Sequence, residues 1–219
     1  MKGMFLSSFY ATRKQTYIYF IVAIIAAGYF AVFNPLMSSA MAGVMLITPI
    51  TDNIKHEKDS RWMYYVSTLP VKRSDYIKSY FAFYLILFGA SLMIGLVVTT
   101  IVTQSVMIGI MSGLMSFGII GAYSIIFPLT FKFGAENSNV IMIVASILLL
   151  FSFVVFFFIY GMVSGASALE FEKISTEGWL VVIVYAVIGI VITSVSYILS
   201  IKILTNKNYN QYSWCEASH

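Results

Sequence analysis

Six long apolar stretches constrain this chain more than any other feature of its sequence. Each runs without a charged residue, apart from a lysine at the end of the last, and about 20 such residues form a helix that crosses a bilayer. In chain order the stretches are 16–33, 36–51, 80–102, 106–131, 140–160 and 179–203. Hydrophobic residues make up 60% of the chain and charged residues 10%, whereas soluble domains carry about 25% charged residues. We therefore expect an all-α integral membrane protein, with six transmembrane helices in one domain over residues 1–219.

The ends of these stretches add detail to the expected fold. Residues 1–15 mix aromatic and aliphatic side chains with basic ends, which favours a helix in the membrane interface; a cytosolic extension of the first span is the alternative. The stretch 36–51 is short for a full crossing and follows an expected tight turn at Asn34-Pro35. Pro49 and Pro128 are expected to bend or break their helices near one end.

The lysines and arginines predict the orientation. With the N-terminus inside, twelve of them fall in cytoplasmic segments and only Lys173 falls outside; cytoplasmic loops attract such residues. Both termini, including the tail 204–219, are therefore expected to be cytoplasmic. The outer connection 161–178 is long and rich in small residues, and a re-entrant path is one option for it.

Few residues suit catalysis or metal binding. The chain lacks the glycine- and lysine-containing loop that binds ATP phosphates, and it lacks the paired histidines of zinc hydrolases. His56 lies in a charged loop, His219 is the last residue and Cys215 is the only cysteine. The first five spans contain no Asp, Glu, Lys, Arg or His between their boundaries, which disfavours proton-coupled transport. We expect no catalytic residue, metal ligand or cofactor site in this chain.

Small residues at four-residue spacing mark close helix contacts in membranes. Ser39 and Gly43 show this spacing in the second span, and Gly109 and Gly113 show it in the fourth. Packing within one subunit and packing at a subunit interface both fit the pattern.

Residues 52–79 hold ten charged residues, nearly half of the chain's total. Glu57 precedes Arg61 by four positions, the order that favours pairing on a helix, and Trp62 and Tyr65 fall on one face of that helix. Pro70 stops the helix. A solvated connection is the alternative, but aromatic residues beside basic ones are typical of contact surfaces.

This segment resembles one found in bacterial permeases of the type-2 ABC transporter class. The shared pattern begins with an acidic residue and a tryptophan, followed by Leu-Pro and a basic pair. Tyr-Ile and Ser-Tyr then lead into span three. The matching residues are Glu57, Asp59, Trp62, Leu69, Pro70, Lys72, Arg73, Tyr76, Ile77, Ser79 and Tyr80. The family's lysine between Ser79 and Tyr80 is absent, and Lys78 stands one place earlier. The opening "MKGMFLSSFYATRKQ" is also similar to the family's start, and the chain is most similar to permeases that export phenol-soluble modulins from staphylococci.

The resemblance implies a permease subunit in the bacterial plasma membrane. Two such subunits, identical or sister chains, would form the pathway and bind two ATPase subunits, which hold the ATP and Mg²⁺. The resemblance assigns the contact with the ATPase to residues 52–79, and the contact residues would be Glu57, Asp59, Arg61, Trp62, Tyr65, Leu69, Pro70, Lys72 and Arg73. A second contact would lie at 132–140, with Lys132 and Glu136. The expected cargo is an amphipathic peptide or a lipid-like molecule, and no nucleic acid partner is expected.

Two other classes remain open from the sequence. A secondary transporter would follow an ion gradient and ignore ATP depletion. A membrane enzyme, immunity protein or scaffold would act without an ATPase partner.

Overall fold

The computed structural model describes residues 2–59, 73–133, 137–164 and 176–206, and within these ranges the regular structure is entirely helical. The elements are α1 (Lys2–Phe33), the short 3₁₀ helix η1 (Pro35–Met37), α2 (Ser38–Asp59), α4 (Arg73–Thr103), α5 (Val106–Tyr123), α6 (Ile126–Phe133), α7 (Ser138–Ser164) and α8 (Thr176–Asn206). Each of the six apolar stretches falls within one of these helices or, for 36–51 and 106–131, within a consecutive pair.

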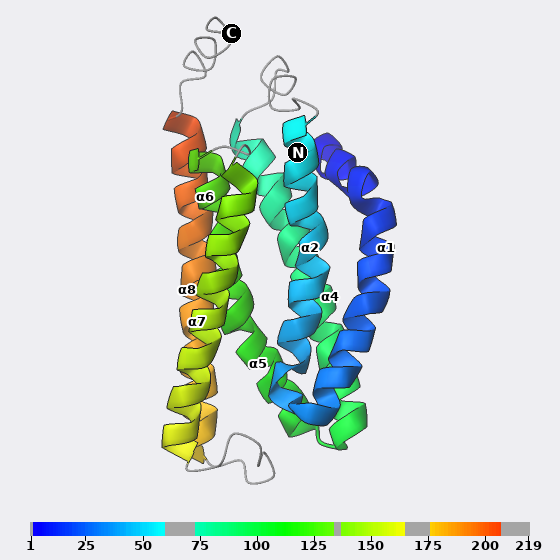
Figure 1. The fold of residues 1–219 in the computed structure, drawn as a ribbon, viewed down its shortest axis with the longest axis vertical. Helices are drawn as coiled ribbons and strands as arrows, with labels where there is room; N and C mark the ends of the chain where they lie inside the picture. Colours follow the sequence, from blue (N-terminus) through cyan, green and yellow to red (C-terminus); the bar gives the residue numbers. More distant parts are fainter. Residues whose placement is uncertain (1, 60–72, 134–136, 165–175, 207–219) are drawn as a thin grey trace, which may run out of the picture.

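Five segments of these helices are long and apolar enough to cross a membrane. They are Thr12–Phe33, Asp75–Thr103, Val106–Phe133, Asn139–Val163 and Gly178–Thr205. Helix α2 is less apolar because its second half carries charges, yet it runs alongside α1 and α4 over the length of the bundle (Figure 1). The expected all-α integral membrane fold is confirmed.

Helix α2 lies inside the bundle, where α1, α4 and α5 cover it. A stripe of small residues on α1, formed by Ala23, Ala27 and Ala31, is buried. The Ser38 hydroxyl of α2 donates a hydrogen bond to the Ala27 carbonyl of α1 at 2.9 Å. Residues 38–53 of α2 are all buried or half-buried, so a helix with a short apolar part can lie inside the bundle here.

The α5–α6 segment is the centre of the fold. In its most apolar window 78% of the residues are buried, against 17% in the windows of α1 and α7. The break between α5 and α6 lies at Ser124 and Ile125, just before Pro128. Pro128 has no N–H to donate to the Ser124 carbonyl, and that carbonyl accepts from the Phe127 N–H at 3.2 Å. Helix α2, by contrast, continues without a break through Pro49 to Asp59.

The helix ends sort onto two sides of the bundle (Figure 1). The start of α1, the end of α2, the start of α4, the end of α6, the start of α7 and the end of α8 lie at one end, called here the loop end. The opposite end holds the turns that join α1 to α2 and α4 to α5. The first turns of α1 lie at an angle to the rest of that helix, across the loop end.

Candidate functional site

Three of the nine residues that are expected to contact an ATPase fall in helices whose ends lie at the loop end. Glu57 and Asp59 fall in the last turns of α2, and Arg73 is the first residue of α4. Helix α2 includes residues 52–59, so the first part of the expected loop helix continues the second span. The remaining residues of this set, Arg61, Trp62, Tyr65, Leu69, Pro70 and Lys72, lie outside the described residues, as does Glu136 of the second contact.

The second half of the shared family pattern forms part of the core. Tyr76, Ile77, Ser79 and Tyr80 all lie in the first turns of α4 and are buried. The Asn53 side-chain amide of α2 donates a hydrogen bond to the Tyr80 hydroxyl at 3.0 Å. This bond ties the second half of α2 to the first turns of α4.

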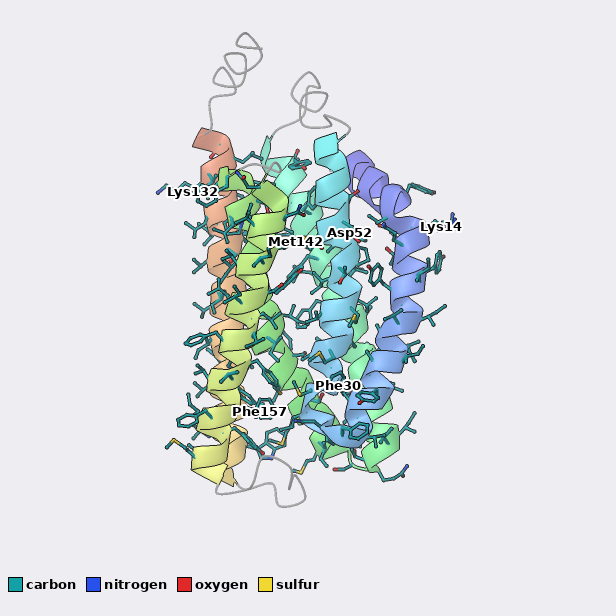
Figure 2. All side chains as sticks on the ribbon, viewed as in Figure 1. Lys14, Phe30, Asp52, Lys132, Met142 and Phe157 are labelled. Carbon is teal, nitrogen blue, oxygen red and sulfur yellow. The ribbon has the colours of Figure 1, made fainter. Side chains whose placement is uncertain are left out.

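The second expected contact begins next to the first. Lys132 is exposed in the last turn of α6, and its ammonium lies 5.3 Å from the centre of the Phe133 ring. Figure 2 shows Lys132 and Asp52 in the half of the bundle nearest the loop end, on α6 and α2. The neighbouring Phe131 is buried, and its ring packs edge-on against Tyr76 of α4, with centroids 6.1 Å apart. The helices that lead into both expected contacts therefore touch each other.

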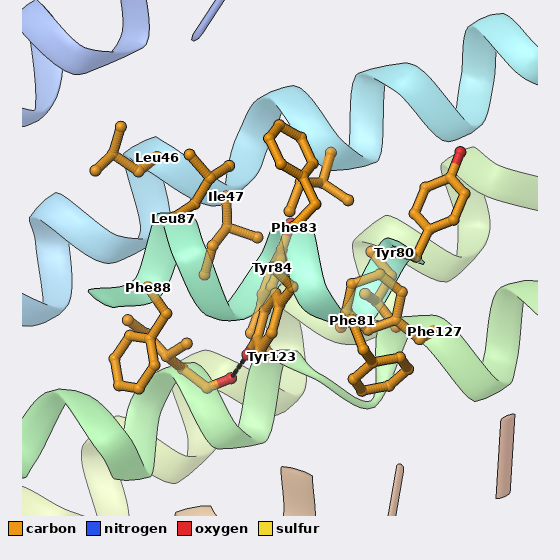
Figure 3. Close-up of a cluster of buried hydrophobic side chains, with 14 of the residues drawn as sticks. Leu46, Ile47, Tyr80, Phe81, Phe83, Tyr84, Leu87, Phe88, Tyr123 and Phe127 are labelled. Carbon is orange, nitrogen blue, oxygen red and sulfur yellow. Dashed lines mark hydrogen bonds between the residues drawn. The ribbon is translucent and has the colours of Figure 1, made fainter. Parts of the chain in front are cut away.

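An aromatic cluster continues this contact into the bundle (Figure 3). Phe81 and Tyr84 of α4 pack against Phe127 of α6, with ring centroids 4.8 and 5.2 Å apart. The Tyr84 hydroxyl donates a hydrogen bond of 2.6 Å to the Ile120 carbonyl. Helix α4 is thus hydrogen-bonded to α2 and α5 and packs against α6 over its first four turns.

The small residues singled out by spacing lie at contacts within this chain. The Ser39 N–H of α2 donates to the Ser112 hydroxyl of α5 at 3.1 Å. A methyl group added at Gly43 would fall 2.0 Å from the Ile120 side chain, and one at Gly109 would fall 2.6 Å from the Thr100 hydroxyl. Gly113 is buried with more room, because Leu92 would be 3.9 Å away.

A close backbone approach between α5 and α8 involves two glycines that the four-residue spacing does not mark as a pair. Gly121 of α5 and Gly189 of α8 meet so closely that a methyl group on Gly121 would lie 2.3 Å from the Gly189 carbonyl oxygen. On the same face, a methyl group on Gly118 would lie 2.2 Å from the Tyr185 ring. Glycines such as Gly121 along the fourth apolar stretch indicate close helix packing, but no pattern in the sequence of α8 indicates Gly189 as the partner.

The fold defines a multi-pass helical membrane protein, and comparison with known proteins gives its class. A family model described as "ABC-2 family transporter protein" matches residues 3–205. The chain belongs to this family, and it is a membrane-spanning permease component of an ABC transporter. Neither the search of curated proteins nor the search of solved structures returned a match to this chain. Permeases of this family work with an ATPase partner, which fits the lack of a phosphate-binding loop in the sequence.

Proposed function

We propose that this chain is the permease half of an ATP-driven exporter, and that residues 52–79 couple it to a separate ATPase. Two permease chains, identical or sister, form the pathway, and two ATPase chains bind at the loop end and hold the ATP and Mg²⁺. The loop end is expected to face the cytoplasm, because twelve of the thirteen lysines and arginines fall in the sequence segments that are expected to be cytoplasmic.

The observation that carries the proposal is the contact between Tyr76 and Phe131. It joins α4, which follows the first expected ATPase contact, to α6, which leads into the second. Asn53 and Tyr80 add the end of α2 to the same packed unit. A force applied by the ATPase at residues 52–79 therefore reaches three helices together, and packed helices move as units.

The proposed cargo is an amphipathic peptide or a lipid-like molecule. The buried side chains of the described spans are apolar or carry hydroxyl and amide groups, and none of them is charged. A pathway built from such helices lacks the charged groups that attract small ions. Apolar surfaces of this kind suit a cargo that has an apolar face of its own.

Replacement of Trp62 tests the coupling. A tryptophan at the centre of an interface typically contributes about 2 kcal/mol or more to binding, so Trp62→Ala is expected to weaken ATPase binding roughly 30-fold. The readout is ATPase stimulation and cargo export in proteoliposomes that hold the complete complex. The matched control is Phe33→Ala, since Phe33 is an exposed aromatic residue at the opposite end.

Normal stimulation and export by Trp62→Ala would overturn the assignment of the loop. Export that persists without ATP and follows an ion gradient would instead favour a secondary transporter.

A further inference from the structure

A groove of about 590 Å³ lies between α4, α5 and α8 towards the loop end. Leu85 of α4 and Ile190 of α8 line it and are each about half exposed, at 52% and 50%, so the groove opens on the outer surface of the chain. Its volume falls within the range of roughly 300–1,000 Å³ that is typical of small-molecule sites.

Aromatic pairs form the walls of this groove, which we call the α4–α8 groove. Phe81 of α4 packs against Tyr197 of α8 with centroids 5.1 Å apart. Farther from the loop end, Phe88 of α4 packs against Phe117 of α5 at 4.8 Å. The lining of α4 extends from Lys78 to Phe88, a rise of about 15 Å, which equals half of the roughly 30 Å hydrocarbon core of a bilayer.

The polar groups of the α4–α8 groove are mostly engaged within the protein. The hydroxyls of Thr193 and Ser194 donate to carbonyls of their own helix at 2.9 Å. The Tyr84 hydroxyl donates to the Ile120 carbonyl. Lys78 is the only charged residue among those that line the groove, and it lies on the first turns of the α4 span, where the membrane interface begins.

We propose that the α4–α8 groove binds one anionic phospholipid, with its phosphate at Lys78 and an acyl chain along the apolar wall between Phe81 and Phe88. The groove is apolar and about one leaflet deep, and it has a single cation at its mouth. It therefore complements a molecule with one anionic head and a long apolar tail. Lysine beside the membrane surface attracts anionic lipids. A basic peptide would instead meet a like charge at Lys78. The proposal is independent of the direction of transport and of the cargo.

Photo-crosslinking of lipid to the full chain tests this proposal. The purified protein is placed in phosphatidylcholine nanodiscs that contain a small fraction of a lipid probe with a diazirine in one acyl chain. The probe is either phosphatidylglycerol or phosphatidylcholine. Cross-linked peptides are then mapped by mass spectrometry. The phosphatidylglycerol probe is expected to label the segments 81–88 and 190–197 about fivefold more than the phosphatidylcholine probe.

Two pairs of variants separate the headgroup from the groove. Lys78→Gln is expected to remove the fivefold preference, whereas Lys202→Gln, at an exposed lysine of α8 outside the lining, keeps it. Leu85→Trp fills the groove and is expected to reduce labelling by both probes. Ile86→Trp is its control, because Ile86 is as exposed, at 55%, but does not line the groove.

Three results would overturn the proposal. They are equal labelling of the groove by the two probes, an unchanged preference in Lys78→Gln, and a covalent dimer formed from p-benzoylphenylalanine at position 85. The last result would assign the groove to a second copy of the chain.

Discussion

At the scale of single residues, glycines set the distance between α5 and α8. Gly121 and Gly189 bring the two backbones into direct contact, and a Cβ at either position would meet backbone atoms of the other helix at less than 3 Å. Backbone cannot rotate away as a flexible side chain can. Without water, association of membrane helices depends on such close packing, so this crossing holds α8 against the centre of the fold.

Gly121→Ala is therefore expected to destabilise the protein. Overpacking in a tight core typically costs about 1–3 kcal/mol, and the apparent Tm of the purified chain in detergent should fall. Gly89→Ala is the matched control, because nothing lies within 4 Å of a methyl group at Gly89. A Tm in Gly121→Ala equal to that of Gly89→Ala would show that α5 and α8 do not meet here.

At the scale of elements, α4 connects the loop end to the rest of the bundle. Its first turns bond to α2 through Tyr80 and pack on α6 through Tyr76. Its next turns reach α5 through the Tyr84 hydroxyl. A movement of the start of α4 therefore has to be shared by α2, α5 and α6.

A double-mutant cycle on Tyr76 and Phe131 tests this shared movement. Tyr76→Leu and Phe131→Leu keep bulk at the site but remove the edge-on ring contact, whose coupling energy should be about 0.5–1.5 kcal/mol. Each variant is expected to lower ATPase stimulation by the permease, and the double variant should add little to the larger single effect. The readouts are thermal unfolding and ATPase stimulation in proteoliposomes.

A ring pair far from the loop end is the control for this cycle. Phe153 and Phe157 of α7 pack at 4.6 Å, and Phe153→Leu should leave ATPase stimulation unchanged. Fully additive effects of Tyr76→Leu and Phe131→Leu on stimulation would contradict a joint movement of α4 and α6.

The sequence predicts the elements better than their contacts. Apolar runs indicate the helices because a bilayer requires each spanning backbone to satisfy its own hydrogen bonds. Pro128 gave a local signal for the break between α5 and α6. The meeting of Gly121 with Gly189 depends on the mutual orientation of two helices far apart in sequence, and so does the groove beside Lys78, so neither has a local pattern. The family pattern indicated Tyr76 and Tyr80, but their burial appears only once α4 is packed.

At the scale of the whole molecule, the helices place both ends of the described chain on one side of the bundle (Figure 1). The same side holds the ends of the helices that flank residues 60–72 and 134–136. Together with the distribution of basic residues, this arrangement predicts a cytoplasmic loop end and an external turn at Gln104, an exposed residue between α4 and α5.

Cysteine labelling of intact cells tests this orientation. In a Cys215→Ser background, Gln104→Cys is expected to react with a membrane-impermeant maleimide. Lys132→Cys, exposed at the end of α6, should react only after the cells are made permeable. The opposite pattern would reverse the orientation and place residues 52–79 beyond the reach of a cytoplasmic ATPase.

The central claim is that this chain transmits work from an ATPase that it does not itself contain. Purification of the affinity-tagged chain from its native membrane, under mild detergent, tests that claim most directly. An ABC ATPase should be recovered with it in equal amount, and Trp62→Ala should lose that ATPase while Phe33→Ala keeps it. A folded chain that never recovers an ATPase would contradict the account.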